Sequence, residues 1–391
     1  MKQPGRLLAS CVLFAVAALS QAPAPRLGVT EYTVFDGDSG WVHEGVTYRL
    51  ACGAALMQAP NGDLLCRWLS GSGTEPATDN NMLMARSTDN GKTWSEPSIL
   101  IPAGAMAGAC TAMWTTGDGK LIAMGARWPS EKEYTEWHYF RMVSTDSGRT
   151  WGAPEPFVVH ENHAALVSPI KLASGEFLFP AMLFEARPQP LRAPVSALLT
   201  ARSETEALAL PPTTGDPGIA SKFLRYLHGN AVFVTSREDG TALTEYGHIA
   251  NRPLGLLEPT CIQLKDGRIV MLMRAELAGR LWRAESTDNG RTWTDAWETD
   301  IPNPTSEIQL LRLEDGPIAL LHNACGEPGK FVQRDPLSVW ISDDEMQSWR
   351  IKEDILRGGW LAYPNGINLN GDLALVYDRN RRQVRFVHVT L

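Results

Sequence analysis

The chain has 391 residues, of which 44% are hydrophobic and 20% charged, and its formal net charge at pH 7 is −8. This composition is typical of a globular chain that can bury a large core. The negative charge and the lack of any basic run argue against nucleic acid or an anionic membrane surface as a partner. The 13 Trp, 34 Gly and 26 Pro favour bulky strands joined by tight turns.

The first 24 residues have the pattern of a secretory signal peptide. Lys2 and Arg6 precede the apolar run Leu7–Leu19, and small residues and prolines follow it. The run is too short to span a bilayer, so we expect no stable membrane span, with a short anchor as the open alternative. The leader predicts a secreted or periplasmic protein.

Beyond the leader, one hairpin pattern recurs six times. Each copy is an apolar stretch, a turn with glycine and a second apolar stretch, and the turn glycines are Gly62, Gly119, Gly175, Gly267, Gly316 and Gly371. Asn-Gly and Asp-Gly turns are typical of β-hairpins. An octet follows four copies: STDNGKTW at 87, STDSGRTW at 144, STDNGRTW at 286 and the degraded SDDEMQSW at 342.

Hairpin and octet together predict a unit of four strands, repeated six times. We therefore predict an all-β fold, a six-bladed β-propeller with four-stranded blades, over residues 27–391 as one domain. Residues 30–35 are expected to complete the last blade. The third unit is too long, which predicts a partly helical insertion at about 186–230, and SREDGTAL at 236 is a faint octet.

The octet itself is interpreted as structural. Its Asp can accept hydrogen bonds from its own turn, its Gly supplies a left-handed backbone, and its Trp packs against a neighbouring strand or blade. Calcium binding by the Asp-rich turn is the alternative. Met346 replaces the glycine in the last octet, so we expect a weaker turn there.

The cysteines beyond the leader show no C-x-x-C spacing, so we expect no zinc and no other metal or cofactor. Most are expected to be buried as small apolar side chains. Pairing of Cys52 with Cys66 stays open.

Repeated Asp-box octets (BNR repeats) on a six-bladed propeller resemble the sialidase (neuraminidase) superfamily, from about residue 40 to the end. The resemblance extends to a Glu that opens an inner strand with an Arg 16 residues later, here Glu258 and Arg274. It also includes an Arg eight residues before an octet, here Arg334, and a Tyr that opens the last inner strand, here Tyr363.

The resemblance implies a retaining exo-glycosidase that acts on sialic acid or another acidic sugar at a glycan terminus. Tyr363 would be the nucleophile and Glu258 its base, because a phenol avoids the repulsion that a carboxylate nucleophile meets beside the sugar's own carboxylate. Arg274 and Arg334 would bind that carboxylate through paired N–H donors. The partner is then a glycan or glycoconjugate; the sequence does not indicate an oligomeric state.

The chain departs from the family pattern at the first arginine, whose position is Cys52. Arg49 or Arg67 can replace the missing cation, and Glu75, or the nearby Asp79, stands where the family has its acid/base. His163 opens the third inner strand and is a further candidate. Residues ranked lower at the channel mouth are Arg127, Trp128, Glu185, Arg187 and Asn323.

Two alternatives remain open. One is a polysaccharide lyase or another glycosidase acting on uronate-containing glycans, with His163 as its base and Tyr363 as its acid. The other is a propeller that binds glycans without catalysis.

Overall fold

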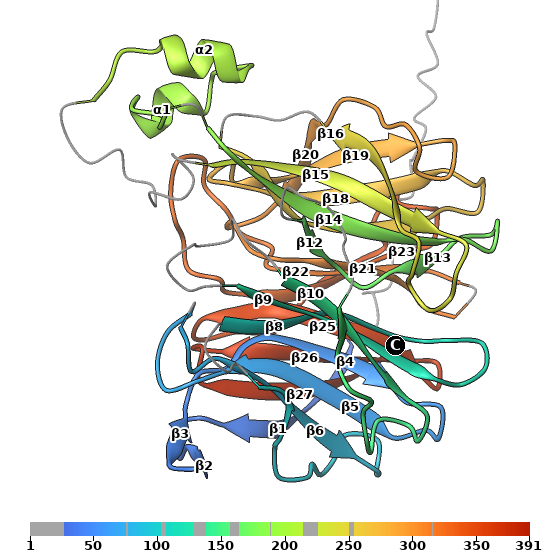
Figure 1. Ribbon diagram of the computed structural model, residues 1–391. Coiled ribbons are helices and arrows are strands. Elements are labelled where there is room, and N and C mark those ends of the chain that lie inside the picture. Colours follow the sequence, from blue (N-terminus) through green and yellow to red (C-terminus); the bar gives the residue numbers. More distant parts are fainter. Residues whose placement is uncertain are drawn as a thin grey trace, which may run out of the picture.

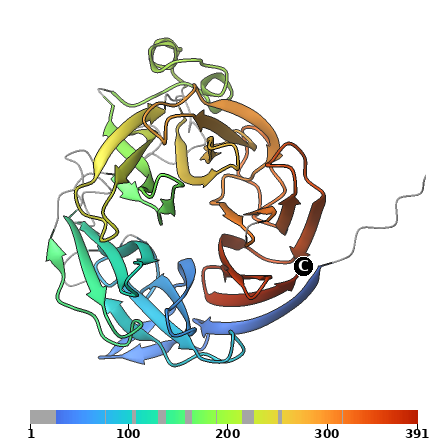
Figure 2. The same ribbon diagram turned by 90° about the vertical axis from the view of Figure 1, so that its right-hand side faces the viewer.

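The computed structural model describes residues 27–75, 77–102, 107–128, 138–156, 164–187, 189–213, 226–249, 254–314 and 316–391. Within these ranges the chain forms six antiparallel sheets arranged in a closed ring, with two short helices outside it (Figures 1 and 2). The prediction of an all-β, six-bladed propeller is confirmed. Neither helix is long and apolar enough to cross a membrane.

Each blade is numbered from the inner strand outwards. Blade 1 contains β4 (Cys52–Gln58), β5 (Leu64–Ser70), β6 (Asn81–Ser87) and β7 (Ser98–Ile101). Blade 2 contains β8 (Ala107–Thr115), β9 (Leu121–Trp128), β10 (His138–Ser144) and β11 (Glu155–Pro156). In blade 3, β12 (Ala164–Leu166) and β13 (Ile170–Lys171) both pair with β14 (Phe177–Ala186), followed by β15 (Tyr226–Thr235) and β16 (Thr244–Ile249).

The other three blades repeat this order. Blade 4 contains β17 (Leu256–Gln263), β18 (Ile269–Ala275), β19 (Arg280–Ser286) and β20 (Trp297–Pro302). Blade 5 contains β21 (Gln309–Arg312), β22 (Ile318–His322), β23 (Leu337–Ser342) and β24 (Ile351–Leu356). Blade 6 contains β25 (Leu361–Leu369), β26 (Asp372–Arg379), β27 (Gln383–Thr390) and, outermost, β1 (Gly28–Asp36).

The pairing of β1 with β27 closes the ring. It runs from Gly28 opposite Thr390 to Asp36 opposite Gln383, so the predicted completion of the last blade by residues 30–35 is confirmed. A small hairpin of β2 (Trp41–His43) and β3 (Val46–Tyr48) then leads into blade 1. Apolar side chains of adjacent blades pack together; Trp68 of blade 1, for example, shares a buried cluster with Phe386 of blade 6.

The octets connect the third and fourth strands of blades 1, 2, 4 and 5. In the first, Asp89 Oδ1 accepts from Thr93 N at 2.9 Å, and Asp89 Oδ2 accepts from Thr93 Oγ1 at 2.6 Å. These hydrogen bonds, together with one from Ser87, lower the pKa of Asp89 to about 2. The expected use of the Asp as an acceptor for its own turn is therefore confirmed.

The last octet keeps the same hydrogen bonds despite its degraded sequence. Ser348 N donates to Asp344 Oδ1 at 2.8 Å, and Met346 N donates to Ser342 Oγ at 2.9 Å. Met346 takes the left-handed conformation of the missing glycine, with φ 65°. A non-glycine residue in that region costs about 1–2 kcal/mol. The last octet therefore keeps the geometry of the turn, but its backbone is strained at Met346.

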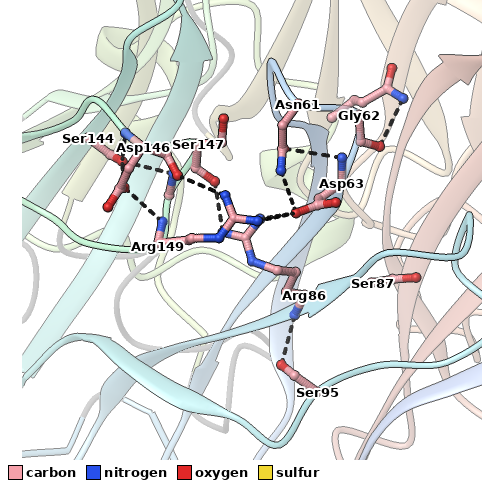
Figure 3. Close-up of polar contacts among 12 residues, drawn as sticks. Asn61, Gly62, Asp63, Arg86, Ser87, Ser95, Ser144, Asp146, Ser147 and Arg149 are labelled. Atoms are coloured by element: carbon pink, nitrogen blue, oxygen red, sulfur yellow. Dashed lines mark hydrogen bonds and ion pairs between the residues drawn. The ribbon is translucent and has the colours of Figure 1, made fainter.

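Octets also join neighbouring blades. Arg86 of β6 donates to Asp63 Oδ2 and to the carbonyl oxygen of Ser147 in the next octet, both at 2.7 Å (Figure 3). Arg149 lies 3.6 Å from the same Asp63 oxygen. Trp94 of the first octet packs against Phe386 of blade 6, with ring centroids 5.7 Å apart. The octet thus closes its own turn and fixes the seam to the adjacent blade.

The strand order places the octets and the inner-strand starts on opposite faces. In an antiparallel blade, the first-to-second and third-to-fourth connections lie on one face, whereas the second-to-third connections and the start of each inner strand lie on the other. The helices α1 (Val195–Leu198) and α2 (Glu204–Ala209) belong to the second-to-third connection of blade 3. Figure 1 shows them beyond one edge of the blades.

Candidate functional site

Glu258 and Tyr363 hold the same position in two inner strands. Each is the third residue of its strand, β17 or β25, and each lies at a β-bulge where the register shifts. Their φ angles are 45° and 54°, a left-handed conformation that is strained in bulky residues. Bulges re-aim side chains and are common beside active sites. The same device therefore orients both side chains at the inner-strand face.

Blade 1 has the equivalent bulge without a functional side chain. Its register shifts between Cys52 and Ala55, and the left-handed residue is Gly53, with φ 61°. The inner strand of blade 1 therefore presents neither a carboxylate nor a phenol where blades 4 and 6 present Glu258 and Tyr363.

Arg274 clamps the Glu258 carboxylate. Its Nη1 donates to Glu258 Oε1 at 2.9 Å and to Oε2 at 2.8 Å, and its Nη2 lies 3.4 Å from Glu276 Oε2. The Arg274 and Glu258 side chains are only 9% and 15% exposed. Burial opposes the charged guanidinium, but the two carboxylates outweigh it and raise the pKa of Arg274 above its usual value.

Tyr363 lies close to this pair and to a second arginine. The Arg334 guanidinium carbon is 5.2 Å from the Tyr363 ring centroid and 4.9 Å from that of Trp360, and its Nη2 donates to the Thr305 carbonyl oxygen at 2.9 Å. Burial raises the pKa of the Tyr363 phenol well above its usual range; the negative charge of Glu258 adds to this, and Arg334 opposes it. Such a phenol needs a base to act as a nucleophile.

A third arginine, Arg381, lies beside Cys52. Its Nη2 is 2.7 Å from Glu75 Oε1 and 3.4 Å from Cys52 Sγ. Arg381 belongs to the tight β26–β27 connection and has φ 55°. Sequence reasoning missed it, because the repeat register describes inner strands and octets but not this connection.

Two further buried carboxyls complete the site and were also missed. Glu307 lies just before β21, near Glu258, Arg67, Arg274 and Arg334, and burial followed by the Glu258 charge raises its pKa to about 8. Asp378, near the end of β26, accepts from Gly53 N at 3.3 Å, and burial raises its pKa to about 8 as well. Both carboxyls are therefore largely neutral near pH 7.

The structure thus brings together six of the sequence-predicted residues: Tyr363, Glu258, Arg274, Arg334, Glu75 and Arg67, the last through its proximity to Glu307. The neighbouring Cys52 thiol is buried and free, as is Cys66.

Two other candidates make their contacts elsewhere. Arg49 donates to the backbone carbonyl oxygens of Gly37 and Asp38, at 3.3 and 2.8 Å. Asp79 accepts from Ser72 N at 2.9 Å and so closes the β5–β6 connection. His163 lies outside the described residues, as do the side chains of Trp128 and Glu185.

The remaining lower-ranked residues have structural partners. Arg127 lies over the Phe140 ring, and Arg187 pairs with Glu204 of α2 at 2.6 Å. Asn323 is fully buried and donates to the carbonyl oxygens of Pro336 and Leu361, at 2.8 and 2.9 Å. Leu361 is the first residue of β25, so this hydrogen bond helps to fix the strand that carries Tyr363.

The helical segment of blade 3 borders the same face. Leu191 and Leu198 of this segment belong to a buried cluster that also contains Leu257 and Leu277. Leu257 directly precedes Glu258, so the segment packs against the residue next to the clamped one. Within the described ranges, no group of three His, Cys, Asp or Glu residues is arranged to hold a metal ion.

The chain is similar to several sialidases. It is 24% identical over 407 residues to a sialidase from Micromonospora viridifaciens, a match that covers 92% of this chain and 54% of that protein. The chain therefore spans about half the length of this curated relative.

Solved structures share the fold. A Trypanosoma rangeli sialidase in complex with sialic acid matches with a TM-score of 0.65 and 15% identity, over 93% of this chain and 59% of that one. A protein of unknown function from Dyadobacter fermentans matches with a TM-score of 0.65 and 14% identity, over 93% of this chain and 99% of that one. The model of the BNR repeat-like domain matches residues 61–375, and the chain belongs to this family, with a sialidase-like propeller.

Proposed function

We propose that the protein is a secreted, sialidase-like exo-glycosidase that removes sialic acid or another acidic sugar from the end of a glycan. The observation that carries this proposal is the gathering of Tyr363 with Glu258, Arg274 and Arg334 at the start of the inner strands. Similarity to sialidases supports the same class of substrate.

The proposed mechanism retains the configuration at the anomeric carbon. Glu258 takes the phenol proton as the Tyr363 Oη attacks the anomeric carbon, and Glu75 donates a proton to the departing glycosidic oxygen. Water then attacks the glycosyl–tyrosine, with Glu75 taking its proton, and Tyr363 leaves and recovers its own proton from Glu258. Arg334, together with the neighbouring Arg274, holds the carboxylate of the sugar.

Hydrolysis of fluorogenic α-sialosides and β-glucuronides by the purified full chain tests the proposal. The variant Tyr363→Phe should lose about 1,000-fold or more in kcat, and Glu258→Gln about 100-fold or more. Tyr32→Phe, on the outermost strand of the last blade, is the matched control and should keep wild-type activity.

Inactivity of the wild type on every acidic glycoside, or full activity of Tyr363→Phe, would reject the mechanism. Binding of acidic glycans without turnover would favour the non-catalytic alternative. An unsaturated uronate product would favour the lyase, whose second candidate residue, His163, lies outside the described residues.

A further inference from the structure

We propose that Arg381 is the carboxylate-binding arginine that replaces the one absent at Cys52, delivered from the last blade instead of the first. The inference rests on the proposed function and names a specificity-determining residue of the same site.

The backbone of the β26–β27 connection is fastened directly to the start of blade 1. Ala51 N donates to the Arg381 carbonyl oxygen at 3.0 Å, and Gly53 N donates to Asp378 Oδ2 at 3.3 Å. These two hydrogen bonds lie on either side of Cys52. Arg381 is therefore held in register with the position where the arginine is missing.

The other side of the connection is fixed to the residue beneath Arg334. Asn380 N donates to the Trp360 carbonyl oxygen, and Trp360 N donates to Asn380 Oδ1, both at 2.8 Å. The Trp360 ring stacks against the Arg334 guanidinium at 4.9 Å. The connection thus ties Arg381 to the residue that stacks on Arg334, and the charges of both arginines act on the carboxyl of Asp378. A sugar carboxylate can bind both arginines in the same way.

Cys52 provides the space for this arrangement. Its side chain is small and buried, and its Sγ lies 3.4 Å from Arg381 Nη2. An arginine at position 52 would compete with the Arg381 guanidinium for the same volume, because protein interiors leave no room for a second side chain of that size. The two positions are therefore alternative sources of one cation.

The present partner of Arg381 is exchangeable. The side chains of Arg381 and Glu75 are 40% and 25% exposed, and solvent-exposed ion pairs contribute little net stability. A substrate carboxylate can take the place of the Glu75 carboxylate on Arg381. The exchange releases Glu75 beside Tyr363, where the proposed mechanism needs a proton donor, so binding of an acidic sugar prepares the site for catalysis.

The experiment compares sialic acid glycosides with their neutral methyl esters. Arg381→Ala should lower kcat/KM for the acid by about 10- to 100-fold, the contribution of a hydrogen bond to a charged group, and leave the ester within about 2-fold of wild type. Arg382→Ala, in the same connection, is the matched control and should change neither substrate. Calorimetric binding of free sialic acid to the same variants supplies a readout without turnover.

The relocation variant Cys52→Arg/Arg381→Ala gives the sharpest outcome. For the acidic glycoside, its kcat/KM should be at least about 10-fold higher than that of Arg381→Ala, since the new arginine enters the volume left by the Arg381 side chain. Equal losses for acid and ester, or no loss in Arg381→Ala, would overturn the role of Arg381 while leaving the glycosidase intact. A wild type that neither binds nor hydrolyses acidic sugars would instead overturn the proposed function, and the inference with it.

Discussion

Arg274 Nη1 lies 2.9 and 2.8 Å from the two oxygens of Glu258, so a single nitrogen holds both. The second nitrogen of the guanidinium faces Glu276, whose side chain is fully buried. One arginine therefore pairs with two carboxylates, and it has a structural role in addition to any contact with substrate.

Replacing this arginine should destabilise the protein strongly. Arg274→Ala removes the guanidinium that pairs with the buried Glu258 carboxylate, and breaking a buried ion pair from one side costs about 3–5 kcal/mol. Arg268→Ala, which removes an exposed arginine of the neighbouring turn, should cost no more than about 1 kcal/mol. Urea unfolding of both variants measures the two free energies; similar values would contradict the clamp.

The stability of the protein should respond to pH through Asp378. Its ordinary pKa is 3.8 and its pKa in the fold is about 8, so between these values the unfolded chain loses a proton that the folded chain keeps. The stability contributed by this group is complete below about pH 4, falls as the pH rises towards 8, and is constant above.

Asp378→Asn removes this titration. The free energy of unfolding of this variant, minus that of wild type, should therefore increase from pH 5 to pH 8. Urea unfolding at each pH measures both free energies. Glu307→Gln should show the same trend, since the pKa of Glu307 is also raised to about 8. If the difference in free energy of unfolding between variant and wild type did not change with pH, the raised pKa values of Asp378 and Glu307 would be wrong.

Binding of an acidic sugar should weaken above pH 8. Glu307 is surrounded by Glu258, Arg67, Arg274 and Arg334, and its ionisation adds a negative charge where the sugar carboxylate is expected to bind. The dissociation constant of sialic acid, measured by calorimetry from pH 6 to pH 9, should rise in wild type and rise less in Glu307→Gln. If the dissociation constants of wild type and Glu307→Gln changed equally with pH, Glu307 would not act on the bound sugar.

The first octet should contribute to stability and not to catalysis. A Cβ at Gly91 would lie 2.3–2.7 Å from atoms of the Phe386 ring, whereas a Cβ at Gly62 would meet nothing within 4 Å, although both glycines have φ near 90°. Gly91→Ala should therefore destabilise more than Gly62→Ala, by about 1–3 kcal/mol of overpacking.

Activity per folded molecule should be unchanged in both glycine variants, because the octets and the candidate site lie on opposite faces. Thermal unfolding measures the first effect and kcat/KM the second. A selective loss of activity in Gly91→Ala would contradict a purely structural octet.

The repeat predicts the fold because its glycine turn recurs in all six blades and its octet in four of them. The glycines at 62, 267 and 371 and the octets at 87, 286 and 342 determine the blade register, and Glu258 and Tyr363 follow from that register. Arg381, Asp378 and Glu307 have no repeated counterpart. Their proximity depends on the closed ring, which joins positions more than 300 residues apart, such as Ala51 and Arg381.

The seam between the last and first blades has a consequence for how the site comes into being. Cys52 and Glu75 come from blade 1, Tyr363 and Arg381 come from blade 6, and β1 holds blade 6 shut by pairing with β27. The contacts of Arg381 with Cys52 and Glu75 therefore form only when blade 6 meets blade 1. In an open ring Trp68 of blade 1 would also lose its packing against Phe386 of blade 6, so the core at this seam and the proposed site assemble together.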